Sequence, residues 1–255
     1  MITSKDLNTA LKALHTHLKE QGRTRLVLGI SGGVDSAATL GFLLKLQEKY
    51  PNRYEVVPVS CPIYDSEGTT EQAEAQDLAN RLCYHFGIEL RTINLQCMSR
   101  QATTTLKADT PYLVQQVDYW LRPMAFYKVS MESSNSVLVG TINKSEWMLG
   151  WFSQYLDVLG VNPIIDLFKS EVYQLAELVN VPSFITEVPP KGGLADGSTD
   201  EESLGFTYQD LEDFMSCPNP LHPSTPLIVD RMRSSQFKRD RFNPAFVQGF
   251  FKDYY

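Results

Sequence analysis

The chain has 255 residues, which is enough for one large α/β domain or two smaller ones. Apolar residues make up 43% of it and aromatic residues 11%, so it can bury a full core and a disordered chain is excluded. The net charge of −7 argues against a protein that binds nucleic acid or a membrane surface, because both need a basic face.

The cysteines and the chain start bear on cellular location. No C-x-x-C pair occurs among Cys61, Cys83, Cys97 and Cys217, which disfavours zinc and thiol-redox chemistry. The first residues lack the apolar core of a signal peptide, and there is no run of 18 apolar residues. We therefore expect a cytoplasmic protein with free thiols and no membrane partner.

The first third of the chain predicts a helix, a strand, a helix and a strand. An amphipathic helix is indicated by leucines at helical spacing, namely Leu7, Leu11, Leu14 and Leu18. An apolar run over 26–30 is typical of a buried strand, and a helix should follow it to about Tyr50. Residues 54–60 read as a second strand, in which Pro58 favours a position at the edge of the sheet.

The alternation continues along the rest of the chain. A Thr69-x-x-Gln72 capping box predicts a helix to Gly87, and a strand should follow it over 88–95. Thr110-Pro111 predicts the start of a helix to about Met131, with a kink at Pro123. After it we expect a strand over 137–140 and helices over 143–151 and 169–179. Strands that alternate with helices predict a doubly wound parallel sheet with helices on both faces. Ligands of such sheets bind at the carboxyl ends of the strands.

The most informative stretch is Ser-Gly-Gly-Val-Asp-Ser over 31–36, between the first strand and its helix. Gly32 and Gly33 lack the Cβ atoms that would hold a ligand off the backbone, so their N–H groups and the helix dipole favour an anion. Ser31 and Ser36 add hydroxyl donors, and Asp35 can hold the magnesium ion that accompanies a polyphosphate. The alternative is a Gly-Gly turn that only lets the strand and helix pack closely.

A second strand-to-helix junction, Gly-Thr-Ile-Asn-Lys-Ser-Glu over 140–146, should lie at the same edge of the sheet. Thr141 offers a hydroxyl there, and Glu146 offers a second magnesium carboxylate opposite Asp35. Asn143 and Glu146 also have the spacing of a plain helix cap, so both interpretations stay open.

Two later segments each allow a functional and a structural interpretation. Residues 188–205 are rich in proline, glycine and acids, which suits either a lid over a site or an ordinary surface loop. Basic residues gather near the C-terminus, either as a solvated helix face or as contacts to a phosphorylated substrate: Arg231, Arg233, Lys238, Arg239 and Arg241.

The turn over 31–36 resembles the pyrophosphate loop of the N-type ATP pyrophosphatases, whose fold is of the adenine nucleotide alpha-hydrolase type. Together with 140–146, it resembles the ammonia-dependent NAD⁺ synthetases that lack a glutaminase domain. The other matching segments are Asn-Pro-Ile-Ile-Asp-Leu-Phe-Lys over 162–169, Val-Pro-Pro over 188–190, Ser-Thr-Asp-Glu-Glu-Ser-Leu-Gly over 198–205 and Phe-Lys-Arg over 237–239. The resemblance extends from about residue 5 to residue 245.

This resemblance implies one domain over 1–255, with a lid over about 188–205 and a C-terminal segment over about 206–255. It implies ATP and Mg²⁺ as cofactors, and amidation of deamido-NAD⁺ by ammonia through an acyl-adenylate, with AMP and pyrophosphate as products. Pyrophosphate would be held by Ser31, Gly32, Gly33, Asp35 and Ser36. Asp35 and Glu146 would bind Mg²⁺, Thr141 would contact the adenylate, and Lys169 and Lys191 would contact the nucleotide. Lys169, Asp35 and Ser36 are the expected catalytic residues, and residues 59–63 would line the adenine pocket.

Two segments depart from the family pattern. The family has Tyr-Gly-Asp-Gly-x-x-Asp where this chain has residues 155–161, and Asn-x-x-Ala-Arg-x-Arg-Met where it has residues 117–124. Both segments bind the second substrate in the family. The chain is therefore either a divergent NAD⁺ synthetase or an amide ligase for another small-molecule carboxylate; a non-catalytic nucleotide-binding module is a third alternative.

The family also implies a homodimer whose interface helps to form the deamido-NAD site. Aromatic residues of the expected helix over 111–131 would suit such an interface, although they would equally suit the core. These residues are Tyr119, Trp120, Phe126 and Tyr127.

Overall fold

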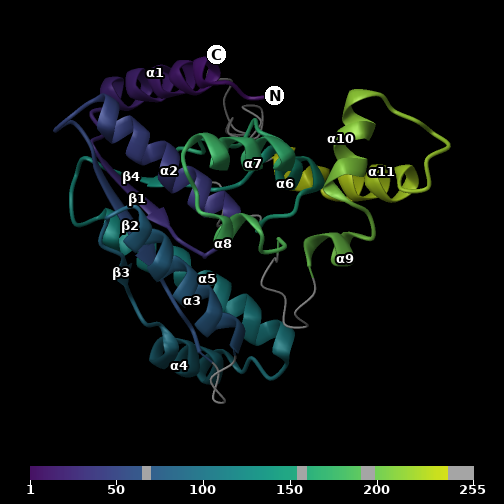
Figure 1. Cartoon of the computed structure of the whole chain (residues 1–255). Helices are drawn as coiled ribbons and strands as arrows, with labels where there is room; N and C mark the ends of the chain where they lie inside the picture. The colour runs from purple at the N-terminus through teal and green to yellow at the C-terminus, as the bar shows by residue number, and fades with distance from the viewer. Residues whose placement is uncertain (65–69, 154–159, 191–198, 241–255) are drawn as a thin grey trace, which may run out of the picture.

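The computed structural model describes residues 1–64, 70–153, 160–190 and 199–240 (Figure 1). Its sheet has four parallel strands in the order β3-β2-β1-β4, namely Arg91–Thr92, Glu55–Ser60, Arg25–Gly29 and Ser136–Val139. Strand β1 pairs with both β2 and β4, so Leu28 lies opposite Pro58 on one side and Val139 on the other. A single parallel bridge from Val139 to Val161 extends the sheet beyond β4.

Helices connect and cover the strands. They are α1 (Ser4–Glu20), α2 (Val34–Lys49), α3 (Thr70–His85), α4 (Gln96–Leu106), α5 (Pro111–Ser130), α6 (Lys144–Leu149), α7 (Lys169–Leu178), α8 (Ser183–Thr186), α9 (Asp200–Leu204), α10 (Tyr208–Ser216), α11 (Thr225–Ser234) and α12 (Gln236–Asp240). Within the described part of the chain, no helix is both long and apolar enough to cross a membrane.

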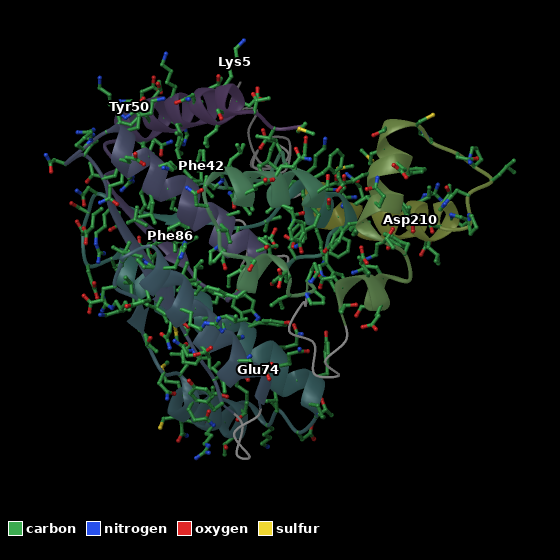
Figure 2. All side chains as sticks on the ribbon, in the orientation of Figure 1. Lys5, Phe42, Tyr50, Glu74, Phe86 and Asp210 are labelled. Carbon is green, nitrogen blue, oxygen red and sulfur yellow. The ribbon has the colours of Figure 1, made fainter. Side chains whose placement is uncertain are left out.

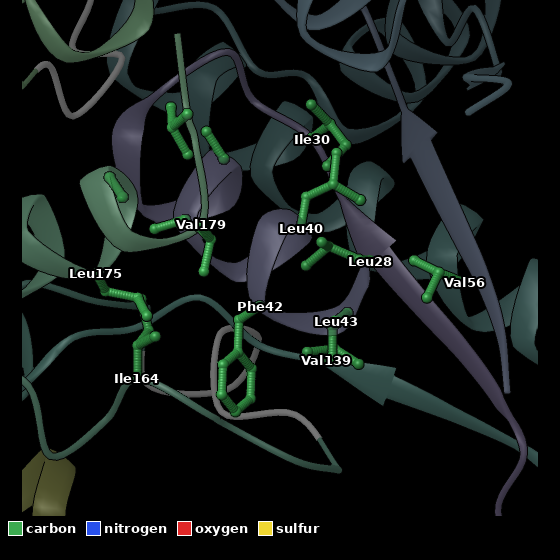
Figure 3. Packing of buried hydrophobic residues seen from close by; sticks show 14 of the residues in the cluster. Leu28, Ile30, Leu40, Phe42, Leu43, Val56, Val139, Ile164, Leu175 and Val179 are labelled. Atoms are coloured by element: carbon green, nitrogen blue, oxygen red, sulfur yellow. The ribbon is translucent and has the colours of Figure 1, made fainter. Parts of the chain in front are cut away.

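Side chains of β1 alternate between two cores, which confirms the predicted sheet with helices on both faces. Leu26 and Leu28 pack in a cluster with α1, α2, α3 and α7, whereas Val27 packs in a second cluster with α5. Figure 3 shows the first cluster, in which Leu28 and Leu43 lie near Val139 of β4. Burial of each such leucine contributes about 1.5–3 kcal/mol to stability. The paired cores thus fix the strand ends that carry the site.

The predicted edge position of Pro58 is wrong, because β2 lies between β1 and β3. The Glu55 N–H donates to Thr24 O of the β1 side, and Ile93 N–H donates to Ser60 O from the β3 side. Even-numbered residues of β2 therefore direct their backbone groups toward β3. Strand β3 pairs only with Val59 and Ser60, so the missing N–H of Pro58 lies just before that short ladder.

The segment after α3 also differs from expectation. The strand expected over 88–95 is reduced to Arg91–Thr92, and α4 follows it where no helix was expected. Three consecutive threonines, which favour helices weakly, concealed α4 in the sequence. In the structure Thr103, Thr104 and Thr105 each donate a hydroxyl hydrogen bond to the carbonyl four residues back.

The C-terminal helices form a cluster of their own with α6, beside the main body (Figures 1 and 2). Leu149 of α6, Leu211 of α10 and Ile228 of α11 are its fully buried residues. Asp210, labelled in Figure 2, accepts hydrogen bonds from Thr207 N and Ser224 Oγ and so joins α10 to α11.

Two of the C-terminal basic residues bind backbone carbonyls at the end of α6. Lys238 donates to the carbonyls of Gly150 and Phe152 at 2.8 and 2.7 Å, and Arg239 donates to those of Trp147 and Met148 at 3.2 and 2.8 Å. They satisfy helix-end carbonyls and complement the helix dipole. Arg241 lies outside the described residues.

Candidate active site

The turn after β1 leaves backbone donors accessible. Gly32 has a φ of +84°, and a Cβ there would lie 2.8 Å from the Ala75 carbonyl oxygen of α3. A Cβ on Gly33 would meet only Ser31 Oγ, at 3.5 Å. The close-packing interpretation therefore explains Gly32, whereas Gly33 keeps the outer side of the turn open. No side chain caps the first turn of α2, which begins here, so this N-terminus suits an anion.

The two serines of the turn have different positions. Ser36 is buried; its Oγ donates to the Gly33 carbonyl at 3.0 Å and accepts from the Ser31 N–H at 3.3 Å. It therefore holds the turn in shape from inside. Ser31 is exposed, with its hydroxyl beside the Gly33 N–H at 3.3 Å. Of the two, only Ser31 presents its side chain at the surface.

Asp35 joins the two strand-to-helix junctions. Its Oδ1 accepts a hydrogen bond from Asn143 Nδ2 at 2.8 Å, and its Oδ2 accepts one from Lys169 Nζ at 2.6 Å. These residues belong to the first turn of α2, the N-cap of α6 and the start of α7. The expected meeting of both junctions at one edge is confirmed, because β1 and β4 are parallel neighbours.

Glu146 both caps α6 and faces the lysine. Its backbone N–H donates to Asn143 Oδ1 at 2.9 Å, and its Oε2 accepts from the Asn143 N–H at 3.2 Å, which forms the capping box. Its Oε1 lies 3.6 Å from Lys169 Nζ, and 16% of its side chain is exposed. Burial raises the pKa of Glu146 to about 8, the charge of Asp35 adds to the rise, and Lys169 opposes it.

Lys169 is the buried cation of the site, with 3% of the residue exposed. Burial alone lowers its pKa, but the charges of Asp35 and Glu146 more than reverse this effect, so the pKa is raised overall. The ammonium also lies 5.3 Å from the centre of the Tyr208 ring. Its backbone N–H donates to Ser145 Oγ at 3.0 Å, which fixes the start of α7 against α6.

The donor set fits a hard divalent cation. Asp35 and Glu146 present carboxylate oxygens to the same small region, which a single ammonium neutralises only in part. The described residues contain no group of three metal-ligating side chains. Two carboxylates are nevertheless enough for Mg²⁺, which keeps several waters and takes further ligands from substrate phosphates.

The remaining expected site residues are placed less fully. Thr141 is half-buried just beyond the end of β4, and residues 59–63 are buried at the end of β2. Lys191 lies outside the described residues. Of the divergent segment 155–161, residues 155–159 also lie outside them. In the other segment, Arg122 donates to the Cys61 carbonyl at 3.3 Å and to Gln72 Oε1 at 3.4 Å, so it joins α5 to β2 and α3.

Sequence reasoning missed three residues around Lys169. Asn143 was considered only as a cap, yet its side chain also binds Asp35. Asp200 was part of a quoted motif but had no assigned role, and Tyr208 was not considered. In the structure Asp200 is buried and accepts from Tyr208 OH at 2.9 Å. The run Asp-Glu-Glu at the start of α9 was the sequence signal for an acid that faces inward, because only one of these three acids can do so on so short a helix.

Comparison with known proteins identifies the family. The family model described as NAD synthase matches residues 6–241. The NH(3)-dependent NAD(+) synthetase of Syntrophomonas wolfei is 32% identical over 230 residues, which cover 87% of this chain and 88% of that protein.

Two solved structures share the fold. The NMN synthetase of Francisella tularensis matches with a TM-score of 0.82 at 24% identity, over 100% of both chains. The NH3-dependent NAD synthetase of Campylobacter jejuni, solved in complex with the nitrate ion, matches with a TM-score of 0.70 at 25% identity, over 94% of this chain and 96% of that one. The chain therefore belongs to the NAD synthase family and is an enzyme of the ligase class that uses ATP and Mg²⁺.

Proposed function

We propose that this chain converts deamido-NAD⁺, ATP and ammonia into NAD⁺, AMP and pyrophosphate. The observation that best supports the proposal is the meeting of Asp35, Glu146 and Lys169 beside an open, glycine-rich turn at the N-terminus of α2. This arrangement supplies anion donors, two carboxylates and one buried cation, as transfer of an adenylyl group requires.

The proposed reaction has two steps. The substrate carboxylate attacks the α-phosphorus of ATP, which forms an acyl-adenylate and releases pyrophosphate. Ammonia then attacks the acyl carbon, AMP leaves, and one proton is lost as the amide forms. ATP is needed because a carboxylate and an ammonium ion do not condense at neutral pH.

The chain contributes positions and charges to these steps. The N–H groups of residues 31–36 bind the departing pyrophosphate, and Ser36 keeps the turn in the required shape. Lys169 neutralises charge on the phosphates, and Thr141 contacts the adenylate from the end of β4. Asp35 and Glu146 would hold Mg²⁺, which supplies further charge neutralisation when it is bound.

Nicotinic acid mononucleotide is the second candidate substrate. It is favoured by the full-length fold match to an NMN synthetase, together with the divergence of residues 117–124 and 155–161 in this chain. Because the match to this NMN synthetase shows a shared fold, it indicates which second acid to test. The same two steps would then yield nicotinamide mononucleotide.

The test offers both acids to the purified chain with ATP, Mg²⁺ and ammonium. The amide and AMP are quantified by chromatography, and kcat/KM is compared between the two acids. The proposal requires equal amounts of NAD⁺ and AMP from deamido-NAD⁺. A higher kcat/KM for the mononucleotide would assign the second candidate, and a lack of amide from both acids would overturn the amidation itself.

We infer that residues 188–205 close over the site. Support comes from their two flanks, because the Asp200 N–H donates to the Pro190 carbonyl at 3.0 Å beside the Lys169 region. Residues 191–198 lie outside the described residues. Lys191 among them remains a proposed nucleotide contact.

We also infer a homodimer that pairs through α5. Five large, apolar residues of this helix and its C-cap are exposed at spacings of seven, four, three and four positions, which place them on one side, as in paired helices. They are Leu113, Trp120, Met124, Tyr127 and Met131. Of the aromatic residues considered for the interface, Phe126 instead packs against Gly29 of β1 and belongs to the core.

A cytoplasmic location is the final part of the proposal. Its support is that all four cysteines are free, with Cys61 and Cys83 buried as thiols. Reduced thiols are typical of that compartment.

A further inference from the structure

Asp200 is a buried carboxylate that joins three segments of the chain. Its Oδ1 accepts from Trp151 Nε1 at 3.2 Å, and its Oδ2 accepts from Tyr208 OH at 2.9 Å. Its backbone N–H binds the Pro190 carbonyl at 3.0 Å. Only 4% of Asp200 is exposed. A buried charge is costly unless it is fully bonded, and a neutral side chain would suffice for packing alone. A carboxylate at this buried position therefore indicates a role beyond packing.

Tyr208 connects Asp200 to the lysine of the site. The hydroxyl of Tyr208 is held by Asp200, while its ring lies 5.3 Å from Lys169 Nζ. An ammonium within about 6 Å of a ring centre is attracted to the ring face. The Tyr208 N–H also donates to Glu201 Oε1 at 2.8 Å, so the start of α10 is bound to α9 twice. The ring thus has a fixed position relative to Lys169.

We propose that Asp200 and Tyr208 are positioning residues, which hold the Lys169 ammonium in place. The inference rests on the proposed function, in which Lys169 acts on the nucleotide. Asp200 does not touch the reacting atoms; it orients the Tyr208 ring, and the ring steadies the lysine. Placement of the lysine therefore depends on one carboxylate, through the ring that it anchors.

The experiment compares Tyr208→Phe and Tyr208→Leu with the matched control Tyr54→Phe. Tyr54 is equally buried, and its hydroxyl bonds with His15 away from the site. We expect Tyr208→Phe, which keeps the ring but loses its anchor, to lower kcat about three- to tenfold, and Tyr208→Leu to lower it more, as loss of a cation–π contact implies. The KM for ATP should change by less than about twofold, because the effect lies on the reacting arrangement.

The outcomes separate positioning from stability. The two phenylalanine variants should lose similar thermal stability, whereas only the Tyr208 variants should lose kcat and the exchange of labelled pyrophosphate into ATP. Wild-type kcat in both Tyr208 variants, or a kcat loss in Tyr54→Phe of the same size, would overturn the inference. Activity is measured with whichever acid the wild type amidates. Failure of the proposed function would instead appear as an inactive wild type.

Discussion

The pH dependence of Mg²⁺ use tests the role of Glu146 most directly. Burial and the nearby charge of Asp35 raise the pKa of this carboxyl to about 8, so without metal it keeps its proton to a higher pH than a free glutamate does. Magnesium binds the carboxylate and must displace that proton. Mg²⁺ binding should therefore weaken as pH falls, by at most about tenfold per pH unit below the pKa of Glu146. Apparent Mg²⁺ affinity should therefore rise from pH 6.5 to 8 and level off above 8.

Glu146→Gln separates the metal role from the cap. A glutamine keeps an oxygen that can accept from the Asn143 N–H, so α6 should stay intact. It removes one of the two carboxylates, and we expect the Mg²⁺ concentration for half-maximal activity to rise tenfold or more, about 1.4 kcal/mol per decade. In this variant the Mg²⁺ affinity should no longer rise between pH 6.5 and 8.

The free energy of unfolding should change with pH in the opposite direction to the Mg²⁺ affinity. Because the folded pKa of Glu146 lies above its ordinary value of 4.5, the folded state binds the proton more tightly than the unfolded state. Without metal, the free energy of unfolding should fall as pH rises from about 4.5 to about 8, by at most about 1.4 kcal/mol per unit. The difference in free energy of unfolding between Glu146→Gln and the wild type, from urea titrations across this range, isolates the contribution. Mg²⁺ titrations that do not change with pH, or with the substitution, would reduce Glu146 to a helix cap.

Four further predictions follow from other features. Asp35→Ala should abolish AMP and pyrophosphate release and keep the circular dichroism of the wild type, because Asp35 is partly exposed at a turn; near-normal turnover would refute the phosphate site. Leu40→Ala should cost about 2.7–5 kcal/mol in urea unfolding, since Leu40 is fully buried. Trp120→Glu should yield monomers by sedimentation at concentrations where the wild type and Tyr84→Glu, a control at an exposed residue of α3, sediment as dimers. Proteolysis within 188–205 should slow only when ATP, Mg²⁺ and the acid are all present; equal rates would make it an ordinary loop.

Local sequence patterns were sufficient to predict the turn over 31–36 and the position of Glu146. The turn over 31–36 was predictable because the apolar strand, the two glycines and the helix start are contiguous in the sequence. The position of Glu146 was predictable from the strand before it, since parallel neighbours end at one edge. The cap predicted from the spacing of Asn143 and Glu146 is confirmed, and the second carboxylate oxygen of Glu146 faces Lys169. Its magnesium role stays a prediction.

Long-range contacts explain what sequence reasoning could not supply. Asp200 lies among acids in a polar segment, and only the fold shows that it turns inward to Tyr208 and Trp151. Pro58 obscured the internal position of β2 in the sheet. A proline is tolerated there because β3 is only two residues long and pairs with Val59 and Ser60, so the missing N–H of Pro58 is not needed for pairing. Helix α4 was concealed by threonines that satisfy their hydroxyls on the backbone of the helix itself.

The attachment of α12 to α6 has a consequence for synthesis of the enzyme. Helix α6 has six residues and carries Glu146, and its terminal carbonyls are bound by Lys238 and Arg239. So short a helix is unstable alone. A ribosome-bound chain that ends before residue 238 therefore has every expected nucleotide and magnesium contact, but it lacks the side chains that bind the end of α6, the helix that carries Glu146. We therefore expect activity to appear only once α12, and not merely the glycine-rich turn, has been translated.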